Sequence, residues 1–551
     1  MTADLVILNA RIRAQFAPAG TTAIAARDGL ILALGDDAAI RAHVAPETRV
    51  IDAAGRELLP GFVESHLHLF MGGASLSMLP LGSTFGFEAT KAAFEEFMAA
   101  NPGDEILFGL GVNYVIFGED RRPDRHLLDQ ISAERPICLL ATDLHCAWAN
   151  TRALELAGIL QGADVGPGAE IVMGEDGLAT GELREFAAMK RVRNLSILKG
   201  RDSLAYRPAA VPPTEEERAH DRDVIRLAGD YCARHGITSA VNMDGNEYQA
   251  GLMRELALAG EMPVRVSLPL RLGGEDGPEG IDRLDAYGPE VPGWLSFGRI
   301  KMLLDGVFDT WTALTVTDYP DRPGFRSAPL FDLDNFTAIC VEADRRGLQI
   351  ATHAVGDGAV RATIDAYEAA AKTNGPRDAR HRLEHIDTIT PEDLDRLDPL
   401  GIVASMQPVH PPGSAGLPLE PTVTIMGKSR WPTAFPWRMI RDRGVTLAFG
   451  TDWPVSPISP LYAIHCALTR QPWADDLPDQ RLTLEECLAA YTSGGAYADF
   501  CEDRRGALRE GFDADLVLIE GALEGLSDRA DAARIALTIC GGRVTHSIPE
   551  A

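Results

Sequence analysis

Apolar runs that alternate with helical patterns are the main feature of the middle of the chain. Eight of these runs are candidate strands, because continuous apolar residues between turn residues are typical of strands buried on both faces. Helical patterns separate several of them, for instance at residues 336–346 and 358–372. The candidate strands are residues 58–69, 237–243, 264–272, 297–305, 348–353, 380–386, 402–409 and 445–452. This alternation predicts an α/β fold, namely a (β/α)8 TIM barrel.

Both ends of the chain carry short strand patterns of their own. These patterns are residues 4–9, 22–25, 30–34, 514–519 and 542–545. Neither end is long enough to bury a core alone, so residues 1–57 and 505–551 together predict one small β-sandwich domain. Two separate surface hairpins are the alternative. Residues 58–504 then form the barrel domain, and the long interval after its first strand predicts an inserted subdomain at roughly 72–214, which would shape the pocket.

The charge and cysteine content exclude several classes of partner and site. With 52 basic and 80 acidic residues, the net charge of −28 disfavours nucleic acid and anionic membranes. Eight widely spaced cysteines form no C-x-x-C pair, which disfavours a thiolate zinc site and a disulfide framework. The N-terminus lacks a signal-peptide pattern, and no apolar run is long enough to span a membrane. We expect a soluble cytoplasmic protein.

A His-x-His pair, His66 and His68, ends the first candidate strand. Residues i and i+2 of a strand share a face, so both imidazoles point the same way and can converge on a cation. By itself the motif is weak, since chance supplies such a pair in roughly a quarter to a third of chains with this many histidines. Its place at the carboxyl end of an apolar strand strengthens it.

Later candidate strands end on the same residue types. His353 ends residues 348–353, His385 lies at the end of 380–386, and Asp452 ends 445–452. Active sites of TIM barrels are assembled from the carboxyl ends of different strands. This recurrence predicts a metal site and is hard to explain as core packing.

Lys301 lies inside a candidate buried strand, where an unpaired lysine is costly. Near a cation its amine would tend towards the neutral form, which can capture carbon dioxide and become a metal-bridging carbamate. The alternative is a lysine paired with Asp305 or another acid. The chemistry of the residue alone leaves both open.

Nine segments along the chain, in their order, resemble motifs of the amidohydrolase superfamily. The resemblance is specifically to the amidohydrolase-3 or YtcJ-like branch, which includes N-substituted formamide deformylases. The resemblance covers nearly the whole chain. The matching segments are residues 59–68, 143–150, 179–185, 301–306, 353–357, 381–385, 405–408, 449–455 and 506–516. One departure is residues 307–314, where many relatives carry a Ser/Gly-rich stretch, and it puts the formamide assignment in doubt.

The resemblance implies a ligand set and a mechanism. Lys301 would be N6-carboxylated and bridge two ions, one also held by His66, His68 and Asp452 and the other by His353 and His385. A one-metal variant would use a subset. Asp452 would be the general base for metal-activated water and then the acid for the leaving nitrogen. Oxygen and nitrogen ligands favour Zn2+, with manganese, iron or nickel as the alternatives. The family default is a homodimer.

Candidate substrate contacts come from the insertion and from later loops. The resemblance places His145 near the metals, as a catalytic or substrate-contacting residue; the alternative is a structural histidine at a helix start. The other candidates are Trp148 and Asn150 beside it, Asn113 and Tyr114 after a Gly-rich strand end, and Trp311 and His410 as wall residues, the last two more simply explained as structural.

Hydrolysis of a C–N bond in a linear amide is the leading functional hypothesis, with N-substituted formamides or N-acyl amines as substrates. A second hypothesis is a one-metal deaminase of a cyclic amidine, which would leave Lys301 unmodified. A third is a non-catalytic relative that keeps the barrel for assembly or regulation. Such relatives lose metal ligands, and none of the predicted ligands is missing from this sequence.

Overall fold

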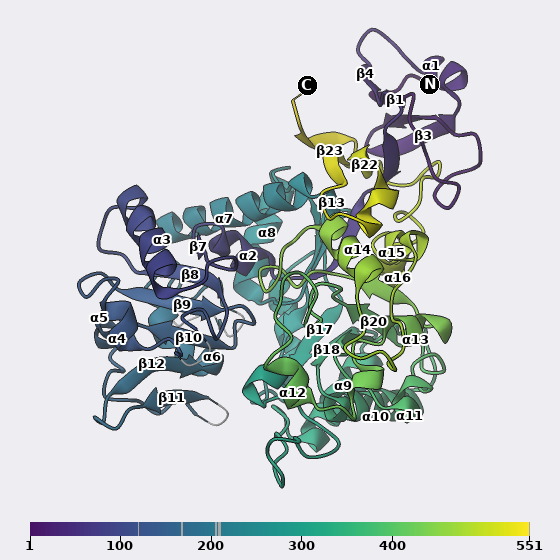
Figure 1. Cartoon of the computed structure of the whole chain (residues 1–551). Coiled ribbons are helices and arrows are strands. Elements are labelled where there is room, and N and C mark those ends of the chain that lie inside the picture. Colours follow the sequence, from purple (N-terminus) through teal and green to yellow (C-terminus); the bar gives the residue numbers. More distant parts are fainter. Residues whose placement is uncertain (119–120, 167–168, 204–205, 208–210, 550–551) are drawn as a thin grey trace. The chain divides into compact units, whose positions relative to one another are not determined.

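The computed structural model describes residues 1–118, 121–166, 169–203, 206–207 and 211–549 (Figure 1). The chain forms two compact units. Unit 1 comprises Met1–Leu69, Arg226–Trp453 and Pro457–Ala551, and unit 2 comprises Phe70–Ile225 and Pro454–Ser456. Strands alternate with helices through most of unit 1, which confirms the predicted α/β class.

Unit 1 is built around parallel strands. They are β6 (Phe62–Leu67), β13 (Ile237–Asn242), β14 (Arg265–Ser267), β15 (Leu270–Arg271), β16 (Leu295–Ser296), β17 (Arg299–Leu303), β18 (Gln349–Ala354), β19 (Arg382–His385), β20 (Val403–Met406) and β21 (Leu447–Phe449). All eight candidate strands are represented. The strands pair in two sheets, β16-β14-β13-β6 and β15-β17-β18-β19-β20-β21, and an isolated parallel bridge joins Leu67 to Trp453. Within the described ranges no single closed sheet is found, so the barrel stays a prediction.

The helices α9 (Leu333–Arg345) and α10 (Asp357–Asn374) agree closely with the two helical patterns of the sequence. The side chain of Asp332 caps α9 by accepting the backbone N–H of Asn335. Both helices pack on β18 and on each other. This arrangement explains why all six residues of β18 are buried, since the strand is covered by helices as well as paired with strands.

The first candidate strand, residues 58–69, is in fact two strands. β5 (Glu57–Pro60) pairs antiparallel with β22 (Leu516–Gly521), and β6 begins only at Phe62. Gly61 lies between them, so close to Thr238 that a Cβ atom would overlap its side chain. The prediction of one continuous strand was wrong here because an apolar run does not reveal a change of pairing partner.

The two ends of the chain form two four-stranded sheets, at the purple and yellow ends of the ribbon (Figure 1). One sheet contains β1 (Leu5–Leu8), β2 (Ala23–Arg27), β3 (Leu30–Gly35) and β4 (Arg49–Asp52), and the other contains β5, β22, β23 (Ala533–Cys540) and β24 (Arg543–Ser547). Backbone hydrogen bonds join the ends, from Ile31 N to Phe512 O and from Ala514 N to Gly29 O. The β-domain of residues 1–57 and 505–551 stays a prediction; β4 and β23 were not foreseen.

Unit 2 has a six-stranded mixed sheet in the order β11-β12-β10-β9-β8-β7. Its strands are β7 (Leu79–Pro80), β8 (Leu107–Val112), β9 (Ile137–Ala141), β10 (Cys146–Ala149), β11 (Glu170–Met173) and β12 (Ala179–Arg184). Helices α3 (Phe87–Ala100), α4 (Arg125–Asp129), α5 (Thr151–Leu156) and α6 (Glu185–Arg193) belong to the same unit. Two clusters of buried apolar side chains give this unit a core of its own.

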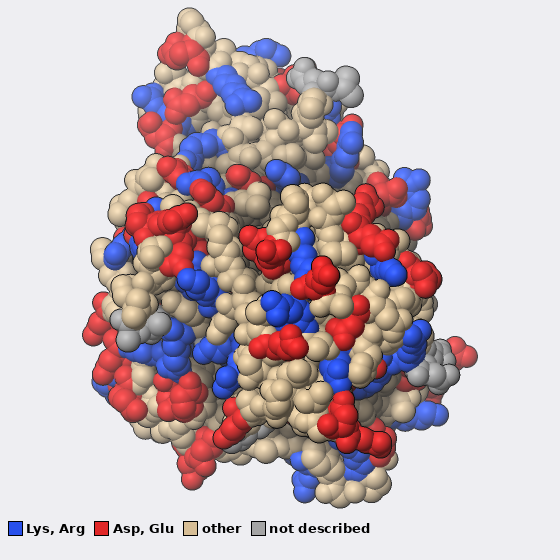
Figure 2. All heavy atoms as spheres, turned by 90° about the vertical axis from the view of Figure 1, so that its left-hand side faces the viewer, with Lys and Arg blue, Asp and Glu red and all other residues tan. Residues whose placement is uncertain are grey.

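Acidic and basic side chains are interspersed on the molecular face shown in Figure 2. No helix in the described part of the chain has the length and apolar character needed to cross a membrane. The predicted cytoplasmic location stays a prediction.

Candidate metal centre

The carboxyl ends of parallel strands in unit 1 carry the predicted metal ligands. His66 lies in β6 and His68 directly follows it, while His353 lies in β18 and His385 ends β19. Asp452 follows β21, and its backbone N–H donates to His66 O at 2.7 Å. Because neighbouring strands run in the same direction, their ends bring these side chains to one edge.

The predicted ligands converge closely. Ligand-type atoms of His66, His385 and Asp452 all lie within 4.8 Å of one another. Asp452 Oδ1 is 3.4 Å from Nε2 of His66 and 3.1 Å from Nε2 of His68. The rings of His353 and His385 lie side by side, with centroids 4.4 Å apart. All five side chains are buried, and Lys301 is near enough to His66 and Asp452 for their charges to interact. The structure thus brings the predicted set together, while metal binding itself stays a prediction.

Hydrogen bonds at Nδ1 orient three of the four imidazole rings, and His353 is paired through Nε2 with Gly306 O at 3.3 Å. The donor–acceptor pairs are His66 Nδ1 with Glu384 Oε2 at 2.6 Å, His68 Nδ1 with Asp244 Oδ1 at 2.8 Å and His385 Nδ1 with Gln407 Oε1 at 2.8 Å. A neutral ring that donates from Nδ1 has its lone pair on Nε2. Within the described residues, His66 Nε2 is buried and has no hydrogen-bond partner. Nitrogen and oxygen acceptor atoms that converge in a buried site are suitable ligands for a divalent cation.

The charge states of His66, His385 and Asp452 suit a cation, while for His68 the interactions with Asp244 and Asp452 outweigh burial and raise the pKa. Burial, and after it the nearby charge of Lys301, lowers the pKa of His66 to about 4, so this ring is neutral at physiological pH. Burial likewise holds the pKa of His385 well below its ordinary value. Burial opposes ionisation of Asp452, but its interactions with His66 and His68 outweigh that effect and hold its pKa well below the usual range. Neutral imidazoles and an ionised carboxylate are the donor forms that zinc-type ions require.

Lys301 is buried in β17, with 1% of its surface exposed. Burial lowers its pKa to about 8, and the charges of Glu384 and Asp452 act in the opposite direction. A substantial neutral fraction near pH 8 is the form that reacts with carbon dioxide. The carboxylate of Asp305, the alternative partner, accepts backbone N–H groups from Leu314, Val355 and Gly356 at 2.8–3.0 Å. These bonds give Asp305 a structural role that does not depend on an ion pair with Lys301.

Two of the converging residues have unusual backbone conformations. His385 has φ of 79° and Asp452 has φ of 59°, both in the left-handed region that residues other than glycine rarely adopt. Strain of this kind is maintained only where surrounding contacts hold it, and it is concentrated at functional sites.

Gly450 lies two residues before Asp452, at a position with no room for a side chain. A Cβ atom there would lie 2.5 Å from His66 N and 2.8 Å from Glu64 Oε1. We expect Gly450→Ala to lower the free energy of unfolding by about 1–3 kcal/mol, as overpacking does, and to weaken zinc binding by displacing His66. Denaturant unfolding and zinc titration would measure both effects.

Gly251 is the matched control, because it lies in helix α8 (Glu247–Leu258) with open space around its Cβ position. Gly251→Ala should be neutral or stabilising by about 0.5–1 kcal/mol. Equal effects of the two substitutions would show that the close approach of Gly450 to His66 is not important.

Comparison with known proteins identifies the family. The model of the amidohydrolase family matches residues 49–546, a range that includes all of the converging side chains. The chain belongs to the amidohydrolase family. The resemblance predicted from the sequence motifs is thereby confirmed.

Three relatives indicate the branch of the family to which this chain is similar. "Protein LONG AFTER FAR-RED 3" of Arabidopsis thaliana is 28% identical over 98% of this chain and 91% of its own length. "Putative amidohydrolase YtcJ" of Bacillus subtilis (strain 168) is 28% identical over 91% of each chain. "N-substituted formamide deformylase" of Arthrobacter pascens is 26% identical over 94% of this chain and 93% of its own. These similarities confirm the YtcJ-like branch.

Solved structures have the same fold. An uncharacterized metal-dependent hydrolase from Pyrococcus furiosus superposes with a TM-score of 0.70 at 25% identity, covering 93% of this chain and 98% of the other. One from Pyrococcus horikoshii OT3 gives 0.73 at 22% identity, covering 96% and 99%. At 22% identity, the similarity to this second structure shows only that the fold is shared.

Two predicted wall residues of this amidohydrolase have different surroundings. The His410 ring stacks on the His385 ring, with centroids 5.8 Å apart, and its Nε2 lies 3.8 Å from Asp452 Oδ2. His410 therefore belongs to the converging cluster. Trp311 instead donates from Nε1 to Asp321 Oδ2 at 2.8 Å and lies under the guanidinium of Arg322. Its observed contacts are thus within its own loop.

The remaining predicted contacts lie in unit 2. His145 Nδ1 is 2.9 Å from Glu185 Oε2, Tyr114 donates to Asp143, and the side chain of Asn113 accepts the N–H of Val115. Trp148 is fully buried in a core cluster, and Asn150 caps α5. Structural roles account for the last two, while the substrate contacts of His145, Asn113 and Tyr114 stay predictions.

The acceptors that orient the histidines were not predicted from the sequence. Glu384 lies in the matching segment 381–385 and Gln407 in segment 405–408, so the motifs contained them without indicating their role. Asp244 comes directly after the candidate strand 237–243. This position at the end of a strand was the one sequence feature that could have indicated a role for Asp244 at the site.

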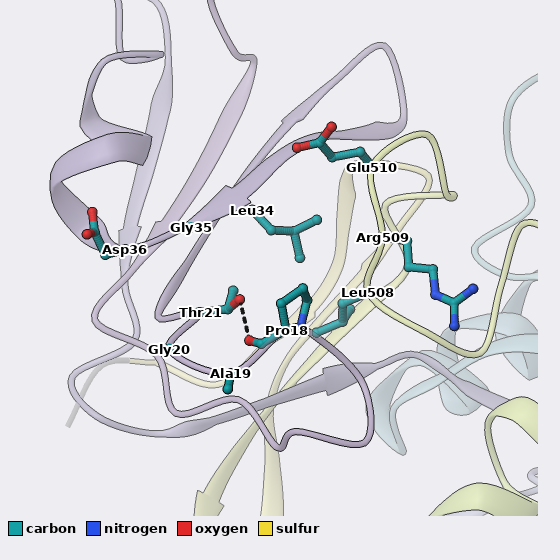
Figure 3. Close-up of a pocket in the computed structure, with 10 residues that line it drawn as sticks. All are labelled: Pro18, Ala19, Gly20, Thr21, Leu34, Gly35, Asp36, Leu508, Arg509 and Glu510. Atoms are coloured by element: carbon teal, nitrogen blue, oxygen red, sulfur yellow. Dashed lines mark hydrogen bonds between the residues drawn. The ribbon is translucent and has the colours of Figure 1, made fainter.

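A separate hollow of about 470 Å³ lies between the loop at Pro18–Thr21, the end of β3 and Leu508–Glu510 (Figure 3). Thr21 donates to Pro18 O inside it, and Asp36 caps helix α1 (Asp37–Arg41). None of the converging histidines lines this hollow. The hollow is therefore separate from the converging side chains.

Proposed function

We propose that this protein is a metal-dependent hydrolase that cleaves the C–N bond of a linear amide. The observation that carries the proposal is the convergence of His66, His68, His385 and Asp452, with ring lone pairs on Nε2. Membership of the amidohydrolase family supports hydrolysis. Similarity to the N-substituted formamide deformylase supports N-substituted formamides or N-acyl amines as the substrate class.

The proposal includes a (β/α)8 barrel that joins the two parallel sheets of unit 1. Two observations support this closure. The bridge between Leu67 and Trp453 connects the first strand with the segment after the last, and β14 is followed by β15 after two residues although they belong to different sheets. The terminal sheets would form the small β-sandwich domain.

The predicted ligands would hold one or two zinc ions. One ion would be bound by His66, His68, Lys301 and Asp452, and the other by Lys301, His353 and His385. When bound, such an ion lowers the pKa of water and polarises a carbonyl group. Carboxylation of Lys301 starts from the neutral amine. Nζ bonds to the carbon of carbon dioxide and releases one proton, which leaves an anionic carbamate.

Asp452 carries the proton in the proposed reaction. It accepts a proton from the attacking water as the water oxygen bonds to the amide carbon. It then gives that proton to the nitrogen as the C–N bond breaks, so the products are a carboxylic acid and an amine. Its Oδ2 lies 4.0 Å from His385 Nδ1 and 3.8 Å from His410 Nε2, which leaves that oxygen among neutral rings.

Substrate contacts complete the proposal. The predicted contacts are His145, Trp148, Asn113, Tyr114, Trp311 and His410, with His145 also as a candidate catalytic residue. The burial of Trp148 favours an indirect role for it, in support of the neighbouring Tyr114 ring 5.3 Å away. The small-molecule amide is the proposed partner, and a homodimer in the cytoplasm stays an expectation.

A hydrolysis screen with zinc-loaded protein tests the proposed function. Formamides, N-acyl amines, ureas, cyclic imides and aminopyrimidines should be compared, with amine, acid and ammonia release measured separately. We expect turnover of a linear amide with equal release of acid and amine. Ammonia release from a cyclic amidine, with one ion per chain and unmodified Lys301, would instead favour the deaminase. No turnover by fully loaded protein of any of these compounds would contradict both.

Removal of the metal should abolish activity reversibly. We expect dialysis against a strong chelator to reduce turnover by about 10²-fold or more, because the protein side chains alone activate neither water nor the carbonyl. Addition of zinc should restore activity and raise the melting temperature, since an ion that binds only the folded state stabilises it. Elemental analysis and calorimetry before and after dialysis would measure these changes. Full activity in metal-free protein would refute the proposal.

A further inference from the structure

A cavity of about 190 Å³ lies in unit 1, and none of the converging histidines lines it. Its walls come from three parallel strands, β13, β14 and β16, and from residues between Asp499 and Arg505. This last segment directly follows helix α16 (Ser493–Ala498). The cavity is therefore separate from the candidate metal centre.

The strand register places three hydroxyl groups on one wall of this cavity. Ser239 pairs with Arg265, and Ser267 pairs with Ser296 on the next strand. Arg265 and Ser267 are two residues apart on β14 and so share a face of the strand. Paired residues of neighbouring strands share that face as well. The three serines therefore lie on the same side of the sheet as Arg265, and all four residues line the cavity.

The hydroxyl group of Ser239 indicates a ligand. Ser239 is 2% exposed, and its Oγ has no hydrogen-bond partner among the described residues. A buried hydroxyl without a partner is costly, and most buried polar side-chain atoms have one. Ser267 Oγ accepts from Arg299 Nη1 at 3.1 Å, which leaves its own O–H for a further acceptor. Both hydroxyl groups can therefore donate to a molecule in the cavity.

Three guanidinium groups meet beside the same cavity, around Gly293. They are those of Arg265, Arg504 and Arg505. Arg265 Nη1 and Arg505 Nη2 both donate to Gly293 O. A Cβ atom on Gly293 would lie 4.0 Å from Arg504 Nη2. Arg504 Nη2 donates to Asp513 Oδ1 at 2.6 Å, and no second acceptor for this guanidinium is found among the described residues. Arg504 therefore has N–H groups available for a ligand.

The charges around the cavity favour an anionic ligand. Two buried carboxylates, Asp513 and Asp515, pair with the three guanidinium groups. Asp499 accepts from Arg299 Nη2 at 2.9 Å, and Asp503 is exposed, where solvent screens its charge. Guanidinium and hydroxyl donors together suit a carboxylate group, because hydrogen bonds to an ionised acceptor are the strong ones.

The size and the aromatic wall of the cavity indicate the rest of the ligand. Trp294 and Phe500 line it, and 46% of the Phe500 surface is exposed. A cavity of about 150 Å³ can hold one benzene molecule, so about 190 Å³ accommodates a single ring with a small substituent. We propose that this cavity binds a small organic carboxylate. The carboxylate group accepts from Ser239, Ser267 and Arg504, and the apolar part lies against Phe500. The inference is independent of the metal-dependent function.

Calorimetric titration of the full chain with benzoate tests the inference, with benzamide as a neutral control of the same shape. We expect benzoate to bind with a Kd of about 1 mM or lower and benzamide to bind about tenfold more weakly or less. Ser239→Ala should weaken benzoate binding by about tenfold or more, because it removes a hydrogen bond to a charged group. Since Ser239 Oγ has no protein partner, this variant should keep the wild-type melting temperature.

Arg504→Gln is the second variant and should also weaken benzoate binding by about tenfold. Asp513 keeps its ion pair with Arg505 at 2.8 Å, so the fold does not depend on Arg504. Arg529→Gln is the matched control, because it makes the same change of charge at an exposed arginine that pairs with Asp531. The control should bind benzoate as the wild type does.

Several results would overturn the inference. They are no binding of benzoate at about 10 mM, equal binding of benzoate and benzamide, or unchanged affinity in both Ser239→Ala and Arg504→Gln. The last result would mean that benzoate binds elsewhere, for instance on a metal ion. Tighter binding of inorganic phosphate than of benzoate would also overturn it, because the site would then be one for inorganic anions. Hydrolysis is not part of the readout, so a failure of the proposed function is distinguished from a failure of this one.

Discussion

Asp452→Asn should reduce kcat by about 10²- to 10⁴-fold and leave the fold and most of the bound metal in place. The amide keeps the size and one oxygen donor of the carboxylate, so an ion can still be held. It cannot accept a proton at neutral pH, and proton transfer from water to the leaving nitrogen is then lost. Oδ1 of Asp452 lies within 3.4 Å of Nε2 of both His66 and His68, whereas Glu384 and Asp244 contact these rings at Nδ1.

Steady-state kinetics with the best amide from the screen, together with elemental analysis, would measure this effect. Asp475→Asn is a suitable control, because Asp475 is exposed and the substitution makes the same change of charge. The control should keep wild-type kcat. Wild-type activity in Asp452→Asn would overturn the assigned proton carrier, and a loss of all metal would mean that its main role is ligation.

The positions of the strands and of the ligands could be predicted because both leave a local signal. An apolar run shows a buried strand, and a histidine or aspartate at its end shows a side chain at the edge of the sheet. His66, His353 and Asp452 were found in this way, and they do converge. The change of partner at Gly61 left no such signal, since the run continues through it.

The supports of the histidines could not be predicted for a different reason. Glu384 meets His66, 318 residues away in sequence, and Gln407 meets His385 on the neighbouring strand. Such contacts depend on strand register and side-chain rotamers, which the pattern of residue types does not contain. Arg382 illustrates the point, because a fully buried arginine in β19 looks costly until its bonds to Glu384 and Ser405 are known.

Lys301→Met should separate a metal-bridging lysine from one that only stabilises the fold. Methionine fills a similar volume without an amine, so no carbamate can form. We expect the variant to lose one bound ion and about 10²-fold or more of kcat/KM. Intact-mass measurement of gently prepared wild-type protein should show the addition of one carbon dioxide, which the variant lacks. A variant with unchanged metal content and activity would favour the deaminase, in which Lys301 is unmodified.

Stability of the metal-free proteins gives the second test of Lys301. Burial lowers its pKa to about 8 in the folded state, against 10.5 for an unperturbed lysine. Below pH 8 both states are protonated, and the folded protein bears the full cost of a buried charge. Between pH 8 and 10.5 the unfolded state binds more protons, so wild-type stability rises with pH relative to Lys301→Met. The variant should therefore be the more stable at pH 7, with a difference that shrinks by pH 10. A less stable variant at pH 7 would show that an ion pair of Lys301 supports the fold.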